Sequence, residues 1–134
     1  MPKVAAPQAA DDHRNLVIEK PPADPRQYRF LTLPNGVAVV LISDPESDTA
    51  AACVTLNVGH MQDPKDLAGL AHLHEHLLFL GNKAYPTEGE YENFLSQHGG
   101  SSNAFTGMDE TGYYFDVTSS QLAGEQATLI QSTL

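Results

Sequence analysis

Residues 71–81 read AHLHEHLLFLG, and this stretch decides the fold of the chain around it. Its histidines stand at alternate positions, so a β-strand would place His72, His74 and His76 together as a three-histidine metal site. A helix, advancing about 100° per residue, would instead place His72, Glu75 and His76 on one side. His74 would then fall within a stripe of leucines, where we expect it to be buried and hydrogen-bonded. A strand would divide those leucines between two faces, so the pattern favours the helix.

The expected ends of this helix are also marked in the sequence. Asp63 is a typical N-cap residue, and Pro64 suits the first helical position. Gly81 suits the left-handed conformation that commonly follows a helix. The sequence therefore predicts one long helix between Asp63 and Gly81.

A second helix and several strands are predicted around the first one. Residues 86–100, PTEGEYENFLSQHGG, begin with the possible cap Thr87 and end in paired glycines. A last helix is expected after Thr118. The predicted strands are YRFLTL and VAVVLIS joined through Asn-Gly, DTAAACVTLNVG, in which Cys53 is expected in the core, and two within SSNAFTGMDETGYYFDV. We therefore expect an α+β fold, with helices packed on an antiparallel-rich mixed sheet.

Composition limits the classes of partner and the organisation of the chain. Its 134 residues suit about one domain, with a flexible Pro- and Ala-rich lead-in over 1–26 and structure over 27–134. The net charge of −10 argues against nucleic acid or an anionic membrane surface. Residues 84–134 hold seven acidic residues and no lysine or arginine, which suits either basic peptides or a solvated face. No apolar run reaches membrane-spanning length, and no secretory signal is evident. A single cysteine cannot form an internal disulfide, which fits a reducing compartment such as the cytoplasm.

The motif His72-x-x-Glu75-His76 carries the chemistry. Two histidines one helical turn apart can direct nitrogens at one zinc ion from about 2.0–2.1 Å. Zinc lowers the pKa of a bound water toward about 7, and a neighbouring carboxylate can accept its proton. This order of residues is the inverzincin signature.

The residues around the motif resemble the pitrilysin/insulysin family of zinc metalloendopeptidases. The resemblance runs over residues 28–117 and includes LPNG (33–36), GLAH (69–72) and SSNAFT (101–106). It implies the first part of an insulysin-type N-terminal domain, with His72 and His76 as ligands of Zn²⁺ and Glu75 as the general base. It also implies that Asn103 and Ala104 lie on an edge strand that pairs with extended peptide substrates.

The resemblance also implies a third zinc ligand, a glutamate on a helix farther along the chain than this sequence extends. Residues 27–134 are therefore expected to be a truncated N-terminal portion of a peptidase domain. A second hypothesis is a non-catalytic interaction fragment, whose apolar faces dock on a full-length relative or on a complementary peptidase domain.

Overall fold

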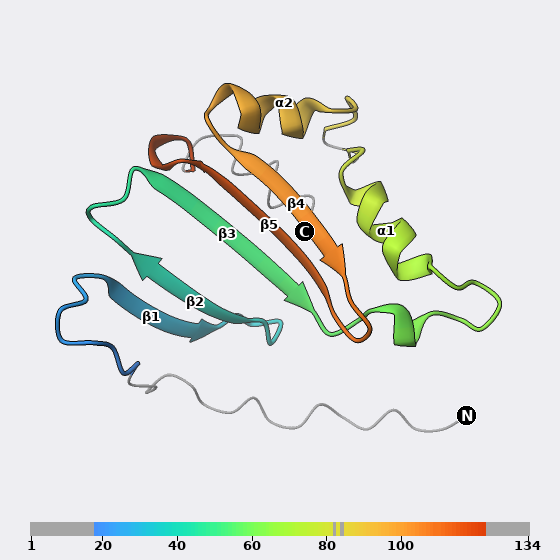
Figure 1. The fold of residues 1–134 in the computed structure, drawn as a ribbon, viewed down its shortest axis with the longest axis horizontal. Helices are drawn as coiled ribbons and strands as arrows, with labels where there is room; N and C mark the ends of the chain where they lie inside the picture. The colour runs from blue at the N-terminus through green and yellow to red at the C-terminus, as the bar shows by residue number, and fades with distance from the viewer. Residues whose placement is uncertain (1–17, 82, 84, 123–134) are drawn as a thin grey trace. The chain divides into compact units, whose positions relative to one another are not determined.

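The computed structural model describes residues 18–81, 83 and 85–122, which form helices and antiparallel strands as the α+β prediction requires (Figure 1). The chain divides into two compact units, Met1–Glu46 and Ser47–Leu134, and each is described by itself. The predicted boundary at residue 26 stays a prediction. After Thr118 the chain forms a short 3₁₀ helix, η3 (Ser119–Gln121), and most of the predicted last helix lies outside the described residues.

The first unit contains the hairpin that Asn-Gly predicts. Strands β1 (Gln27–Thr32) and β2 (Ala38–Ser43) pair antiparallel in continuous register. At the turn, the N–H of Gly36 donates to the Leu33 carbonyl at 2.8 Å. Gly36 has a φ of 88°, a left-handed value that residues with a Cβ rarely adopt, which explains the glycine there.

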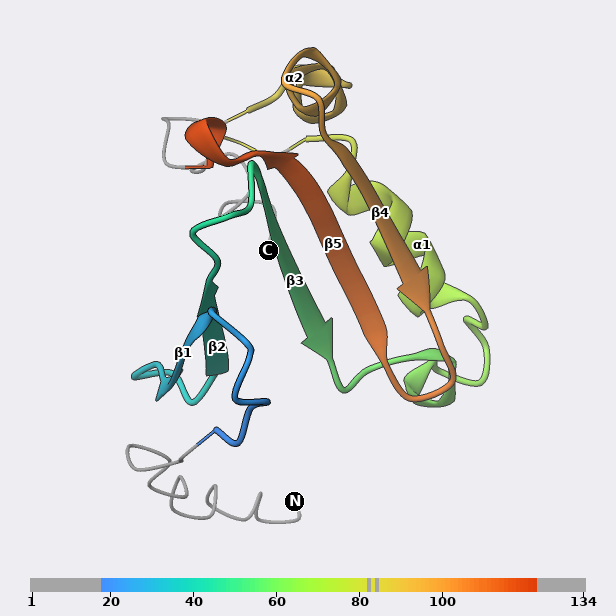
Figure 2. The same cartoon turned by 60° about the vertical axis from the view of Figure 1, so that its left-hand side comes forward.

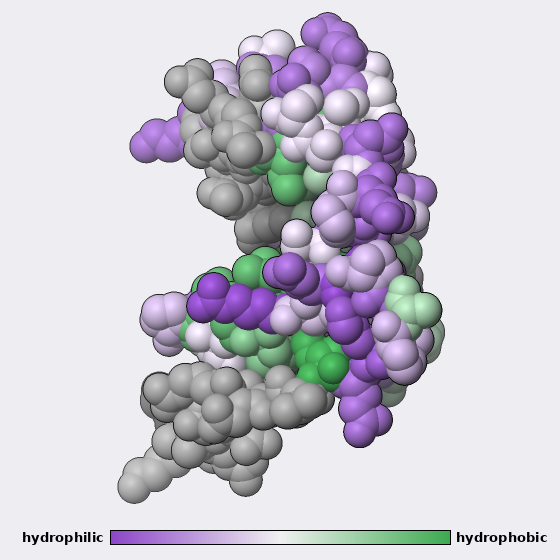
Figure 3. Space-filling model, turned by 90° about the vertical axis from the view of Figure 1, so that its left-hand side faces the viewer, coloured by the Kyte–Doolittle hydropathy of each residue, from purple (hydrophilic) through white to green (hydrophobic). Residues whose placement is uncertain are grey.

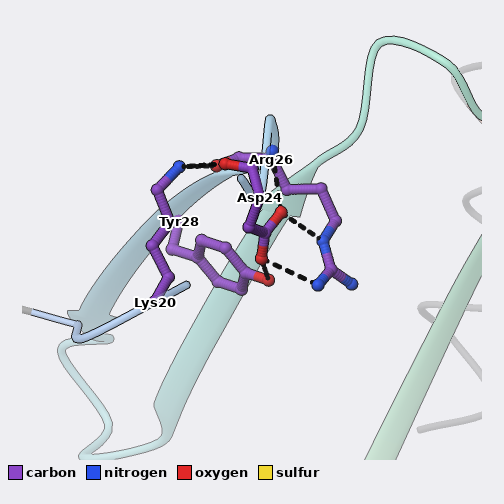
Figure 4. Close-up of polar contacts among 4 residues, drawn as sticks. All are labelled: Lys20, Asp24, Arg26 and Tyr28. Carbon is purple, nitrogen blue, oxygen red and sulfur yellow. Dashed lines mark hydrogen bonds and ion pairs between the residues drawn. The ribbon is translucent and has the colours of Figure 1, made fainter. Parts of the chain in front are cut away.

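A polar cluster ties the segment before β1 to the hairpin (Figure 4). The guanidinium of Arg26 donates to both carboxylate oxygens of Asp24 at 2.8 Å, and the Tyr28 hydroxyl donates to the same carboxylate at 2.9 Å. The ammonium of Lys20 donates to the backbone carbonyls of Asp24 and Arg26. Asp24 is therefore the acceptor on which this cluster depends.

We expect this cluster to make the hairpin unit sensitive to acid. The hydrogen bonds from Arg26 hold the pKa of Asp24 well below its ordinary value. A carboxylate with a depressed folded-state pKa stabilises the fold above its unfolded-state pKa of about 3.9, and this contribution disappears as the pH falls further. The urea midpoint of β1, followed by backbone amide NMR signals, should therefore drop between pH 6 and pH 2.5. Asp24→Asn should lower it at pH 6 and flatten the drop.

The exposed Glu19 provides the matched acid-to-amide control for this prediction. Glu19→Gln should keep the parent's midpoint and pH dependence. An Asp24→Asn chain with the parent's full pH dependence would show that Asp24 is not the responsible group.

The second unit is built on a three-stranded antiparallel sheet. Its strands are β3 (Thr49–Leu56), β4 (Ser101–Thr106) and β5 (Thr111–Thr118), in the order β3-β5-β4 (Figure 1). The turn from β4 to β5 is closed by the N–H of Gly107, which donates to the Glu110 carbonyl at 2.7 Å. In the described part of the chain, β5 is thus central and β4 is an edge strand.

The core lies between β5 and helix α2 (Glu90–Gln97). Phe115 and Val117 of β5 are buried against Phe94 and Leu95 of α2. Alternation along β5 explains this, because every second side chain faces the helix. The predicted glycine ending is present, since the Gly100 N–H donates to the Leu95 carbonyl at 2.8 Å.

Two details of this layer differ from the sequence prediction. Thr87 does not cap α2 through its side chain; the helix begins at Glu90, because Gly89 with a φ of 76° interrupts the turn before it. Cys53 is exposed instead of buried. It lies opposite Tyr114, on the face of the sheet away from the α2 core, where Tyr114 is itself 47% exposed.

The motif helix, α1 (Leu70–Leu78), is shorter than predicted and Asp63 lies outside it. The chain first forms a 3₁₀ turn, η2 (His60–Gln62), and Gly69 has a φ of 91° that no helix interior accepts. Asp63 nevertheless caps α1 from a distance, because its carboxylate accepts the N–H groups of Gly69 at 2.7 Å and Ala71 at 2.8 Å.

Helix α1 lies beside the edge strand β4 (Figure 2). Its leucine stripe is not covered within the described residues. On this helix Leu70, Leu73 and Leu77 are 43–55% exposed, and Leu67, in the turns before the helix, is 56% exposed. Figure 3 shows another face of the molecule, on which hydrophobic residues also lie open among hydrophilic ones. An apolar hollow of ≈ 450 Å³ lies between α1 and β3, with Leu56, Leu70 and His74 in its lining.

Candidate metal centre

The helix brings the two predicted histidine ligands together. His72 and His76 stand one turn apart on α1, with their Nε2 atoms 3.1 Å from each other and their ring centroids 4.8 Å apart. Both side chains are exposed. The strand alternative is therefore wrong, because these residues form a helix.

Glu75 lies beside the pair and is buried. Its side chain is on the sheet-facing side of α1 and the residue is only 7% exposed. The hydroxyl of Thr106, at the end of β4, donates to its Oε2. A buried carboxylate needs such a donor, since an unpaired one would be strongly destabilising. Thr106 therefore fixes one of the two carboxylate oxygens of Glu75.

Tyr113 of β5 forms another part of the surroundings of Glu75. Burial raises the pKa of the Tyr113 hydroxyl, and the negative charge of Glu75 raises it further. Tyr113 is 6% exposed and so stays neutral near neutral pH. Glu75 is thus buried beside a hydroxyl donor, and Tyr113 is near enough for the charge of the carboxylate to act on its phenol.

The two imidazoles fit a zinc ion, with the carboxylate of Glu75 beside it. The ligand atoms of His72, Glu75 and His76 lie within 4.8 Å of one another. Two nitrogens each about 2.0–2.1 Å from one tetrahedral ion would stand about 3.3 Å apart, close to the 3.1 Å between the Nε2 atoms of His72 and His76. The same separation suits a hydrogen bond between two neutral rings when no metal is present.

The prediction for His74 is wrong in one respect. His74 lies on α1 and borders the apolar hollow, but its side chain is exposed and not buried. The periodicity placed it correctly in the leucine stripe, and the stripe itself is open. His74 is not part of the three-residue group around Glu75.

The predicted substrate residues lie on β4, the edge strand of the sheet in the described part of the chain. Asn103 is exposed, and its side-chain oxygen accepts the N–H of the next residue, Ala104, at 2.9 Å. Edge strands offer backbone groups that an added peptide strand can pair with. Their role in peptide binding stays a prediction.

Sequence reasoning missed the residues that support the motif. Thr106 and Glu75 are 31 positions apart in the sequence, and no local sequence pattern predicts a hydrogen bond between them. The sequence predicts Asp63 as a cap, but it does not predict the hydrogen bonds that its carboxylate accepts from the N–H groups of Gly69 and Ala71. The ring of His60 lies next to that of His72, with centroids 6.0 Å apart, but His60 belongs to no sequence motif that would predict this.

A fold of this kind with a His-x-x-Glu-His helix beside an edge strand has clear relatives. Residues 38–133 match the family described as Insulinase (Peptidase family M16). The chain belongs to this insulinase family.

Individual proteins agree with the family assignment. The chain is 53% identical over 107 residues to insulin-degrading enzyme from Homo sapiens, and 51% identical over 110 residues to A-factor-processing enzyme from Saccharomyces cerevisiae. These matches cover 80% and 82% of this chain but only 10% and 11% of those proteins. The crystal structure of pitrilysin superposes with a TM-score of 0.77 at 37% identity, over 81% of this chain and 12% of that one. The chain thus spans about a tenth of the length of the curated relatives it matches.

The remaining predictions concern surroundings and partners. Within the described residues, no helix is long and apolar enough to cross a membrane. The cytoplasmic location, the peptide substrates and the docking on complementary peptidase domains stay predictions.

Proposed function

We propose that this chain supplies the zinc-binding and water-activating part of an insulinase-family metalloendopeptidase. The observation that carries the proposal is the pair of Nε2 atoms of His72 and His76, 3.1 Å apart, beside the buried carboxylate of Glu75. Both imidazoles are the zinc ligands in this proposal, and the carboxylate is the general base. Catalytic zinc usually has three protein ligands, so a further ligand completes the site.

Each side chain has a defined task in peptide hydrolysis. Zinc, when bound, polarises a carbonyl and lowers the pKa of a water molecule. The oxygen of Glu75 that Thr106 does not hold accepts the proton of the attacking water and passes it to the leaving amine. The Thr106 hydroxyl keeps the carboxylate in one orientation throughout, and the ring of Tyr113 keeps bulk water away from it.

The edge strand β4 is the proposed peptide-binding element. An extended peptide that pairs with β4 is held by backbone hydrogen bonds, which give affinity with little dependence on its sequence. The N–H of Ala104 is one such donor, and the side chain of Asn103 occupies it when no peptide is present. Asn103 would therefore swing away to admit a peptide carbonyl. Insulin, which the name of one relative gives as the protein it degrades, is a suitable first peptide to offer.

Zinc affinity tests the ligand assignment directly. We expect His72→Ala and His76→Ala each to weaken zinc binding by at least about 100-fold, because each substitution removes one of the nitrogen ligands of the ion. His74→Ala is the matched control: it removes an exposed histidine from the same helix and should leave the affinity unchanged. The dissociation constants are measured by competition with a chromophoric chelator.

Two outcomes of this experiment would contradict the proposal. One is a parent chain that binds no zinc. The other is a His74→Ala variant that loses zinc as completely as the variants of His72 and His76, since the geometry of α1 assigns them different sides.

A further inference from the structure

We propose that His60 and Asp63 form an outer support for the metal ligand His72, with the Nε2 of His60 accepting the Nδ1–H of His72 when zinc is bound. The inference rests on the proposed function, because it concerns how one proposed ligand is held. His60 belongs to the 3₁₀ turn η2, so the support would come from outside the motif helix.

The first step of the argument is the nitrogen that His72 leaves unused. Nε2 of His72 faces Nε2 of His76, so Nδ1 is left for a second partner. A metal-bound histidine almost always donates its other N–H to an acceptor, which fixes the tautomer and the orientation of the ring. The ring of His60 is a neighbour of His72, edge-on at 89° with a centroid distance of 6.0 Å.

The second step is the tautomer of His60. Its Nδ1 lies 3.7 Å from Oδ2 of Asp63, which is beyond hydrogen-bond distance, but the negative charge of that nearby carboxylate favours a proton on Nδ1. In a neutral imidazole with a proton on Nδ1, Nε2 carries a lone pair and is an acceptor. His60 is therefore set up to accept a hydrogen bond on the side away from Asp63.

The third step is that Asp63 is itself fixed. Its side chain is 8% exposed, and its oxygens accept the backbone N–H groups of Ala71 and Gly69 at the start of α1. These bonds hold the pKa of Asp63 below its usual range, so it stays an acceptor near neutral pH. The same carboxylate thus caps the helix that carries His72 and orients the histidine beside it.

The backbone on either side of His60 is also held. The N–H of His60 donates to the Gly107 carbonyl at 3.0 Å, and the N–H of Met61 donates to the Met108 carbonyl at 2.7 Å. A Cβ on the preceding Gly59 would lie 2.5 Å from the Gly107 oxygen, so the chain packs tightly against this turn. Two imidazoles joined by one hydrogen bond have centroids about 5 Å apart. Side-chain rotation of the partly exposed His60 has to close only about 1 Å.

Zinc affinity and NMR test the proposal on the full chain. We expect His60→Ala to weaken zinc binding 10–100-fold, the range typical for loss of an outer partner. His60→Gln, whose amide can still donate and accept, should recover part of that loss. His74→Ala, which removes an exposed histidine from α1, should bind zinc like the parent. In the zinc-loaded parent the Nδ1–H of His72 should exchange slowly with solvent, and in His60→Ala this signal should be lost.

The possible results separate the proposal from the assignment on which it rests. Unchanged zinc affinity in His60→Ala, or a retained Nδ1–H signal of His72, overturns the role of His60 and leaves the zinc ligands in place. A parent chain that binds no zinc overturns the zinc assignment, and the support with it. If His60→Ala does not fold, His60→Gln decides: a weakened affinity with an unchanged unfolding midpoint supports the role, and an unchanged affinity overturns it.

Discussion

Peptide hydrolysis should fall by about 10²–10⁴-fold when Glu75 is replaced by glutamine, the range expected for removal of a general base. An amide has almost the shape of the carboxylate but cannot accept a proton from water at neutral pH. Its oxygen can still accept the hydroxyl of Thr106, so the helix and the sheet should stay in place. Zinc affinity should therefore remain near that of the parent, since His72 and His76 are untouched.

The activity of Glu75→Gln has to be measured in a protein that also contains the remaining parts of a full-length relative, because this chain matches only about a tenth of such a relative. We suggest a chimera in which residues 38–133 replace the matching segment of insulin-degrading enzyme, to which the chain is 53% identical over 107 residues. Initial rates on a fluorogenic peptide are compared with and without the Glu75→Gln change, at equal zinc occupancy. His74→Ala in the same chimera should hydrolyse the peptide at the parent's rate. Equal rates for Glu75→Gln and its parent would remove Glu75 from the chemistry.

The motif itself could be predicted from the sequence because it is local. Residues four apart on a helix must share a face, so the meeting of His72 and His76 follows from the 100° step once the helix is accepted. The hairpin follows in the same way, because Asn-Gly restricts the backbone over a few residues. In both cases the atoms that decide the geometry are neighbours along the chain.

Contacts between distant segments could not be predicted in this way. The hydrogen bond from Thr106 to Glu75 exists only because β4 lies beside α1, which depends on how the sheet and helix pack. The pattern of leucines around His74 identified an apolar side of α1 but not what covers it, and within the described residues that side is open. The hydrogen bonds from the start of α1 to Asp63 depend on the turns at residues 64–69, because these turns set the distance between Asp63 and the helix.

The same dependence on packing predicts the largest effect on stability, which is expected at Leu95. This side chain is 1% exposed and packs with Phe94, Phe115 and Val117 between α2 and β5. Truncation of a buried leucine to alanine typically costs about 2–5 kcal/mol, because apolar contact is lost and a cavity remains. A small domain has a total unfolding free energy of about 5–15 kcal/mol, so Leu95→Ala should remove a large share of it. Urea unfolding followed by circular dichroism measures the difference.

Leu73→Ala is the matched control, because it makes the same change on α1 at a side chain that is 55% exposed. It should change the unfolding free energy by no more than about 0.5 kcal/mol. If Leu95→Ala leaves no folded protein, the smaller truncation Val117→Ala, at a fully buried site, keeps the comparison measurable. Because zinc should bind the folded chain far better than the unfolded one, saturating zinc should raise the midpoint of the parent and of Leu73→Ala alike. Equal losses of stability in Leu95→Ala and Leu73→Ala would mean that α2 and β5 do not form the core. That core could then not be what keeps Glu75 oriented against β4.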